Sequence, residues 1–153
     1  LPHWKKDLDG PPLFNARGET VASKPSFRDA YKGKNGSGRC LIPMNGYYEW
    51  HEKVPHYVSR PDGKLMWVAG LWASGLDRLS ATMVTTEARE PMDWLHNRLP
   101  RFLLEEEMRP WLEGNMDENL LQPSPKKLRE LFEVRPVDKA VGNVRNDYPE
   151  LIG

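Results

Sequence analysis

Residues 39–51 read Arg-Cys-Leu-Ile-Pro-Met-Asn-Gly-Tyr-Tyr-Glu-Trp-His. The stretch is rich in aromatic residues, and its side chains follow a period of two if Gly46 forms a bulge or a close backbone contact. This pattern predicts strand structure in which Tyr47 and Glu49 lie on the same face. We therefore expect the fold to be organised around a sheet that contains this segment.

Neighbouring segments predict further strands. Residues 55–60 and 65–72 flank residues 61–64, Pro-Asp-Gly-Lys, whose central Asp-Gly pair is a strong turn signal, so we expect a hairpin here. Another strand is expected at residues 80–86 and an extended segment at residues 134–144. Because the short connections leave no room for parallel crossovers, the strands should be mostly antiparallel.

Short helices are expected between these strands. One should occupy residues 91–97, because Pro91 suits a first helical turn and Pro100 must end the helix. The others are expected at residues 23–32, with Ser23 as N-cap and Phe27 and Tyr31 facing inward, at 104–113, closed by Gly114, and at 125–132, opened by Ser124. The chain thus has the pattern of a mixed α+β fold.

Length and composition fit one globular domain. The 153 residues are 39% hydrophobic and 29% charged, with 22 basic and 22 acidic side chains. Residues 1–60 hold 10 Lys or Arg against 6 Asp or Glu, so a basic surface would be local to this part of the chain. The opening Leu-Pro-His-Trp lacks a methionine, and we expect an N-terminal part of the domain to precede it.

Cysteine content and hydropathy limit the class of protein. The single cysteine, Cys40, excludes an internal disulfide framework and a thiolate metal cluster, and it fits a reducing compartment such as the cytoplasm. Its apolar surroundings predict an inert buried thiol. No apolar run approaches the roughly 18 residues that span a bilayer. We expect a monomer without cofactor, metal or membrane partner.

Two side chains are candidates for proton transfer. Glu49 lies between two aromatic residues, a setting that tends to raise the pKa of a carboxyl group; the alternative is a strand glutamate that faces water. His96 is expected at the edge of a loop, where an imidazole can exchange protons near neutral pH. Taken alone, a histidine is more often a surface or packing residue, which is what we expect of His3, His51 and His56.

Other residues suggest contacts with nucleic acid. Residues 15–20, Asn-Ala-Arg-Gly-Glu-Thr, bring an amide, a guanidinium and a carboxylate together. Arg17 can either clamp a phosphate or pair with Glu19. Tryptophans in or just beyond the basic segment can stack on unpaired bases, although most should lie in the core and only one or two should be exposed; they are Trp4, Trp50, Trp67 and Trp72.

Together these segments resemble the SRAP family, the SOS response associated peptidase proteins. Residues 15–20 resemble the family's Asn-Ala-Arg-x-Glu-Thr, and residues 39–50 resemble its Arg-Cys-Leu-x-Pro-x-x-Gly-aromatic-aromatic-Glu-Trp. Residues 84–86, 96–100 and 140–146 resemble its Val-Thr, His-Asp-Arg-Met-Pro and Val-Gly-Asn-Val-Lys-Asn blocks in the same order. The resemblance covers nearly the whole chain and implies a single domain with a strongly bent or barrel-like, mostly antiparallel sheet flanked by short helices.

The resemblance also implies a covalent sensor of abasic sites in single-stranded DNA. In such a protein an N-terminal cysteine, exposed by self-removal of the initiator methionine, traps the sugar aldehyde as a thiazolidine, and some lyase activity can accompany the imine. By motif position, Asn15 would orient this cysteine, Glu49 would transfer protons, and His96 would act as acid or base on the sugar hydroxyl. The DNA contacts would come from Trp4, Arg17 and Arg98.

Two features depart from the family pattern. The reactive cysteine and its strand are not part of residues 1–153, and Asn97 stands where the family usually has Asp, which would lower the proton affinity of His96.

Two other functions stay open. One is a noncovalent single-strand binding module; the other is a thiol peptidase acting on proteins, for which Cys40 is poorly placed and no Cys-His pair is evident.

Overall fold

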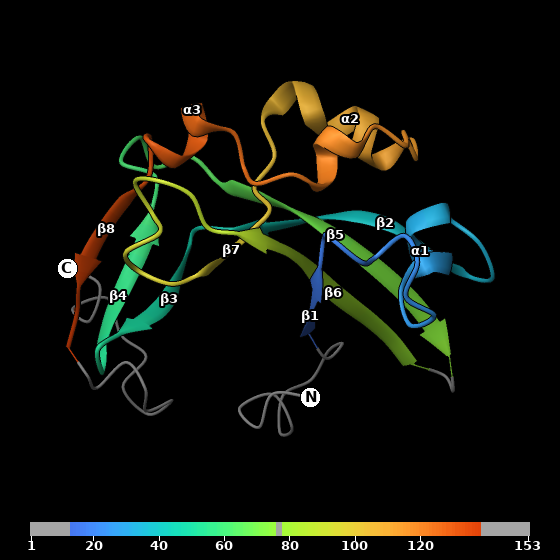
Figure 1. Cartoon of the computed structure of the whole chain (residues 1–153), viewed down its shortest axis with the longest axis horizontal. Helices are drawn as coiled ribbons and strands as arrows, with labels where there is room; N and C mark the ends of the chain where they lie inside the picture. The colour runs from blue at the N-terminus through green and yellow to red at the C-terminus, as the bar shows by residue number, and fades with distance from the viewer. Residues whose placement is uncertain (1–12, 76–77, 139–153) are drawn as a thin grey trace.

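The computed structural model describes residues 13–75 and 78–138, which form two sheets and several short helices (Figure 1). The strands are β1 (Leu13–Arg17), β2 (Ser37–Met44), β3 (Gly46–His51), β4 (Val54–Ser59), β5 (Met66–Gly75), β6 (Arg78–Glu87), β7 (Arg98–Pro100) and β8 (Glu133–Pro136). The helices are α1 (Arg28–Lys32), α2 (Glu105–Leu112), α3 (Lys126–Arg129) and the 3-10 helix η2 (Glu118–Leu121). Within these described residues, no helix is both long and apolar enough to cross a membrane.

The larger sheet has the strand order β1-β6-β5-β2, with β7 paired to the end of β6, and the smaller sheet has the order β3-β4-β8. Each described pair is antiparallel except β1 and β6, which run parallel. Figure 1 shows a bent arrangement of strands with α2 above the larger sheet. The expected α+β fold with a bent, mostly antiparallel sheet is therefore confirmed; the described strands do not close into a barrel.

The 39–51 stretch is divided between the two sheets at Asn45. β2 pairs with β5 in the larger sheet, whereas β3 pairs with β4 in the smaller one. A Cβ atom on Gly46 would lie 2.4 Å from the ring of Tyr57, so this close approach requires glycine. Because side chains alternate along β3, Tyr47 and Glu49 share one face, as the sequence predicts.

The predicted pairing of residues 55–60 with 65–72 is wrong, although the turn between them exists. Gly63 has a φ of 75° and donates its N–H to the carbonyl of Arg60 (3.1 Å), but the turn carries the chain from the smaller sheet to the larger one. The hairpin instead joins β3 to β4 through Glu52 and Lys53, whose φ values are 49° and 67°. Two positive φ angles match the twist of a hairpin, but neither residue is a typical turn former.

The segment 91–97 forms turns rather than the predicted helix. The N–H of Met92 donates to Arg89 and that of Leu95 donates to Met92, both across three residues. A segment bracketed by two prolines is too short to gain from cooperative helix formation, and these turns already bury Met92 and Leu95 in the core. The predicted helix at residues 23–32 is likewise shortened to α1.

The two later helices differ in how well the sequence predicts them. α2 matches the expected range, and Gly114 follows it with a φ of 82°. α3 is shorter than expected, and Ser124 is not its cap. The buried Ser124 hydroxyl instead accepts the N–H of Phe102 (2.8 Å) and donates to the carbonyl of Pro100 (3.1 Å). Because the Ser124 hydroxyl is bonded to Pro100 and Phe102, it is not available to cap α3.

Two apolar clusters hold these elements together. Under α2, Trp111 is fully buried and donates its indole N–H to the carbonyl of Cys40 (2.9 Å). The second cluster joins the two sheets, because it contains Val58 of β4 and Val68 of β5. Leu95 belongs to the same cluster and fixes the 91–97 segment to both sheets.

Candidate functional site

β1 presents polar side chains to solvent. Ala16 is buried in the cluster under α2, whereas Asn15 and Arg17 on either side of it are exposed. Because side chains alternate along a strand, Asn15 and Arg17 project from the same face of β1. An amide and a guanidinium are therefore both accessible to a ligand at this edge of the larger sheet.

Arg98 begins β7 and forms a bidentate pair with Glu19. Its Nη atoms donate to the carboxylate at 2.6 and 2.9 Å, and Nη2 also donates to the carbonyl and hydroxyl oxygens of Thr85 at 2.9 and 3.2 Å. Hydrogen bonding to Arg98 lowers the pKa of Glu19 to about 2, and the same contact raises the pKa of Arg98. The alternative in which Arg17 pairs with Glu19 is therefore wrong: Glu19 pairs with Arg98, and Arg17 is exposed.

Glu49 lies at the boundary between solvent and the interior. It is half-buried on β3, and its Oε1 accepts the N–H of Trp50 at 3.3 Å. Beside it on the same face, the buried hydroxyl of Tyr47 has no hydrogen-bond partner among the described residues. Burial, and to a smaller extent the charge of Glu49, raises the pKa of Tyr47. Glu49 is thus a half-buried carboxylate beside a buried phenol on this face of β3.

The backbone of Arg98 sets the tautomer of His96. The imidazole Nδ1 lies 3.0 Å from the Arg98 nitrogen and 3.2 Å from its carbonyl oxygen. Since a backbone N–H can only donate, Nδ1 accepts from it in the neutral ring, and the proton of that ring is on Nε2. His96 is exposed, so Nε2–H can donate a hydrogen bond to a bound ligand.

Trp94 connects the His96 segment with the sheet that carries Glu49. Its indole is nearly perpendicular to the rings of His51 and His56, with centroids 5.3 and 5.4 Å away. His51 follows Glu49 by two positions on β3, and His56 faces Glu49 across the β3–β4 ladder. From the sequence, both histidines were expected to be surface or packing residues. The register of the β3–β4 hairpin is what brings them together beside Trp94. We call these three rings, Trp94, His51 and His56, the Trp94 cluster.

The tryptophans named from the sequence are less buried than expected, because none of the three that the structure describes lies in a core cluster. Trp50 and Trp94 are 45% and 47% exposed, whereas Trp67 and Trp72 are partly buried. Trp4 and the predicted motif at residues 140–146 lie outside the described residues.

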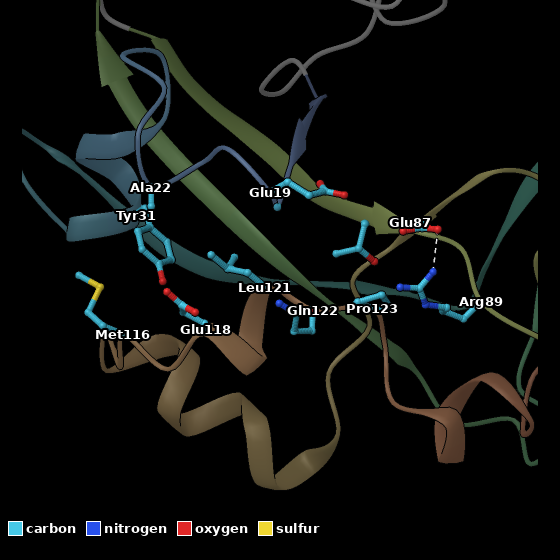
Figure 2. A pocket seen from close by; sticks show the side chains of 12 residues that line it. Glu19, Ala22, Tyr31, Glu87, Arg89, Met116, Glu118, Leu121, Gln122 and Pro123 are labelled. Atoms are coloured by element: carbon cyan, nitrogen blue, oxygen red, sulfur yellow. Dashed lines mark ion pairs between the residues drawn. The ribbon is translucent and has the colours of Figure 1, made fainter.

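A cavity of about 560 Å³ opens beside Glu19, but Asn15, Glu49 and His96 do not line it. Figure 2 shows carboxylates around this cavity, and the guanidinium of Arg89 is held by one of them, Glu87, at 2.6 Å. Its charged lining residues are Glu19, Glu87, Arg89 and Glu118. Because negative charge is in excess, the cavity does not suit a DNA phosphate.

Neither a metal centre nor an activated thiol is evident in the described part of the chain. No group of three or more His, Cys, Asp or Glu is arranged there to hold a metal ion. Burial raises the pKa of the Cys40 thiol, and a Cβ atom on Gly70 would lie 2.8 Å from its sulfur. A thiol packed in this way is a weak nucleophile, as the sequence predicts.

Sequence relatives agree on one family. Residues 1–144 match the family described as SOS response associated peptidase (SRAP). The abasic site processing protein YoqW of Bacillus subtilis is 33% identical over 168 residues, which cover 99% of this chain and 72% of that protein. The abasic site processing protein YedK of Escherichia coli is 30% identical over 162 residues, which cover 99% of this chain and 70% of that protein.

Solved structures share the fold. A protein from Bacteroides thetaiotaomicron superposes with a TM-score of 0.74 at 27% identity, covering 90% of this chain and 64% of that one. A protein from Bordetella bronchiseptica gives a TM-score of 0.67 at 28% identity, with 81% and 64% covered. The chain therefore spans a little less than two thirds of these solved structures. On the evidence of the family match and of relatives at 30% identity or more, the chain belongs to the SRAP family.

Proposed function

We propose that this protein recognises abasic sites in single-stranded DNA and crosslinks to them covalently through an N-terminal cysteine. Relatives named abasic site processing proteins support this assignment. The observation that carries it is the contact between the β3–β4 hairpin and the His96 segment through Trp94. This contact brings the elements that bear Glu49 and His96, the two candidate proton-transfer groups, to one part of the molecule.

The proposed reaction needs an amine and a thiol on the same residue. The α-amine of the cysteine adds to the aldehyde carbon of the ring-opened sugar, and loss of water gives an imine. The thiolate then adds to the imine carbon, and the nitrogen takes up a proton, which closes a thiazolidine ring. The nitrogen of Cys40 is part of a peptide bond, so the proposal requires a different cysteine, one with a free α-amine, outside residues 1–153.

Three described residues have proposed roles in this reaction. Glu49 accepts a proton from the attacking amine and returns one to the departing water, and it assists the hydrolysis that removes the initiator methionine. His96 assists opening of the sugar ring as an acid or base at the hydroxyl. Asn15, exposed on β1, orients the cysteine by hydrogen bonding through its amide.

The DNA backbone is proposed to bind along the edge formed by β1 and β7. Arg17 is exposed and can hold a phosphate directly. Arg98 must share its Nη atoms between a phosphate and Glu19, since both donate to that carboxylate. Trp4 would support the kinked strand. We expect the protein to bind as a monomer, without a cofactor.

Two other functions make different predictions. A noncovalent single-strand binding module would use the exposed Trp50 and Trp94 in the same way for intact and abasic DNA. A thiol peptidase acting on other proteins would need an activated cysteine, and the raised pKa of Cys40 disfavours it in that role.

The test is to mix the full-length protein with single-stranded DNA that contains one abasic site and to look for an adduct that survives denaturation. We expect an adduct that requires the N-terminal cysteine and that is absent with intact DNA or with an abasic site reduced to the alcohol. Mass spectrometry of the protein should show loss of the initiator methionine, and the same gels report strand cleavage. Equal binding to intact and abasic DNA without an adduct would instead establish a noncovalent binder.

A further inference from the structure

Trp94 is exposed although its neighbours are buried. The indole is 47% exposed, whereas Met92 and Leu95 are each 2% exposed within the cluster that joins the two sheets. Burying a tryptophan releases much apolar surface from water, so an indole left half exposed beside two buried side chains gives a ligand a large apolar surface to cover.

The position of this indole is well fixed. Leu95 N–H donates to Met92 at 3.1 Å, and Ala88 N–H donates to Asn97 at 3.0 Å, which closes the segment at its base. On the other side, His56 is buried and its Nδ1 lies 2.9 Å from the carbonyl of Val54, to which it can only donate. These two supports fix the Trp94 ring from both sides, so a ligand would meet a preorganised surface.

The surroundings of Trp94 suit a nucleobase better than a phosphate. His51 and His56 meet the indole almost edge to face, and the His51 side chain, 35% exposed, can offer a ring nitrogen to the polar edge of a base. Asp93 is exposed next to Trp94 and would repel a phosphate. A flat, uncharged and hydrogen-bonding ligand is therefore the one that fits.

We propose that Trp94 is a stacking platform for an unpaired base that neighbours the abasic nucleotide. The inference rests on the proposed function, because Trp94 lies two positions from His96 and its ring contacts His51 and His56, the strand neighbours of Glu49. A base stacked here would hold the strand in place while the sugar without a base reaches the proton-transfer groups. Stacking is tolerant of sequence, since every base presents a flat face.

The experiment measures binding of a single-stranded oligonucleotide that carries tetrahydrofuran, an inert analogue of the abasic sugar. We compare the full-length protein with its Trp94→Leu, Trp94→Phe and Leu112→Ala variants. Leu112 is 50% exposed on α2 and serves as the matched control. A second series of oligonucleotides lacks one further base at each position near the analogue in turn.

We expect Trp94→Leu to weaken binding about 5-fold or more, the effect of losing one stacked base, and Trp94→Phe and Leu112→Ala to stay within about 3-fold. One position in the base-removal series should weaken binding to the wild type by a similar factor and have no further effect on Trp94→Leu. Thermal melting checks that each variant is folded, and Trp94→Phe keeps the ring if leucine is not tolerated.

Two results would overturn the proposal while the wild type still forms the abasic adduct. In the first, Trp94→Leu binds the oligonucleotide like the wild type. In the second, each base removal weakens binding equally for the wild type and for Trp94→Leu. Either result would leave the proposed function standing. A wild type that neither binds the oligonucleotide nor forms an adduct would remove the proposed function and this inference together.

Discussion

Two arginines, three positions apart in the chain, make the same bidentate contact with a glutamate in opposite environments. Arg101 is 1% exposed and donates to Glu107 at 3.0 and 2.7 Å and to the carbonyl of Asn119 at 3.0 Å. Arg98 donates to Glu19 at 2.6 and 2.9 Å, but the carboxylate side of that pair is open to solvent. The first pair ties α2 and η2 to the sheet; the second lies at the rim of the candidate site.

The difference shows that burial, and not contact geometry, decides what an ion pair does. Glu107 also accepts the N–H of Leu104 at 2.9 Å, so this largely buried carboxylate holds two donor groups, the guanidinium of Arg101 and the backbone N–H of Leu104. At the rim, water or a phosphate can replace Glu19, because the carboxylate is only partly desolvated. The buried pair is therefore structural, and the exposed pair can be exchanged on binding.

The largest effect is expected from removing the buried carboxylate of Glu107. Glu107→Ala leaves the Arg101 guanidinium buried without its counter-charge, and we expect a loss of about 3 to 5 kcal/mol in the free energy of unfolding. Glu106→Ala, one position away on the exposed side of α2, should change it by less than about 0.5 kcal/mol. Chemical denaturation measures both, and equal losses for the two variants would contradict a structural role for Glu107.

Removing the arginine of the pair at the rim should affect DNA binding more than folding. Arg98→Ala is expected to weaken binding to single-stranded DNA about 10-fold, the cost of one charged hydrogen-bonding group, and to reduce the slope of log K against log salt by about 0.7. Arg89→Ala is the control, because Arg89 pairs with Glu87 beside the acidic cavity. Salt-dependent binding curves test this; identical curves for Arg98→Ala and wild type would remove Arg98 from the interface.

Removing the exposed carboxylate of Glu19 should strengthen DNA binding, the opposite of the effect expected for Arg98→Ala. Glu19→Gln frees Arg98 from a charge that competes with phosphate, and we expect DNA binding to become about 2- to 5-fold tighter at low salt. The same binding assay measures it. Weaker binding would mean that Glu19 positions Arg98 as Glu107 positions Arg101, and the contrast between the two pairs would fail.

The smallest expected effect is the pH dependence of the exposed pair. The folded pKa of Glu19 is lowered from 4.5 to about 2, so the pair stabilises the folded state above pH 4.5 and loses that contribution as the pH falls toward 2. For a surface pair we expect less than about 1 kcal/mol. Urea midpoints of wild type and Glu19→Gln should differ by a constant amount near neutral pH and converge below pH 4.5; a difference that grows in acid would contradict the pairing.

Local signals in the sequence predicted part of this fold well. The alternation in residues 39–51, the glycine at position 46 and the Asp-Gly turn all have the predicted local structure. The strand pairing could not be predicted, because the chain bends at Asn45 and the hairpin turn uses Glu52 and Lys53, which carry no turn signal. Ser124 shows the same limit, since tertiary hydrogen bonds outcompete a helix cap.

In the candidate site, too, some features could be predicted from the sequence and others could not. Motif positions in the sequence are enough to indicate Asn15, Glu49 and His96, whereas the surroundings of these residues depend on contacts between distant segments. The pairing of Arg98 with Glu19 and the Trp94 cluster each join residues from different elements, so no local pattern could have revealed them.

The decisive measurement is the rate at which Glu49→Gln forms the adduct at saturating abasic single-stranded DNA, with Glu52→Gln on the hairpin turn as the matched control. We predict a rate about 100-fold or more below that of the wild type, as for loss of a general acid or base, with affinity for the tetrahydrofuran oligonucleotide within about 3-fold. Glu52→Gln should react like the wild type. An unchanged rate for Glu49→Gln would contradict the proposed chemistry.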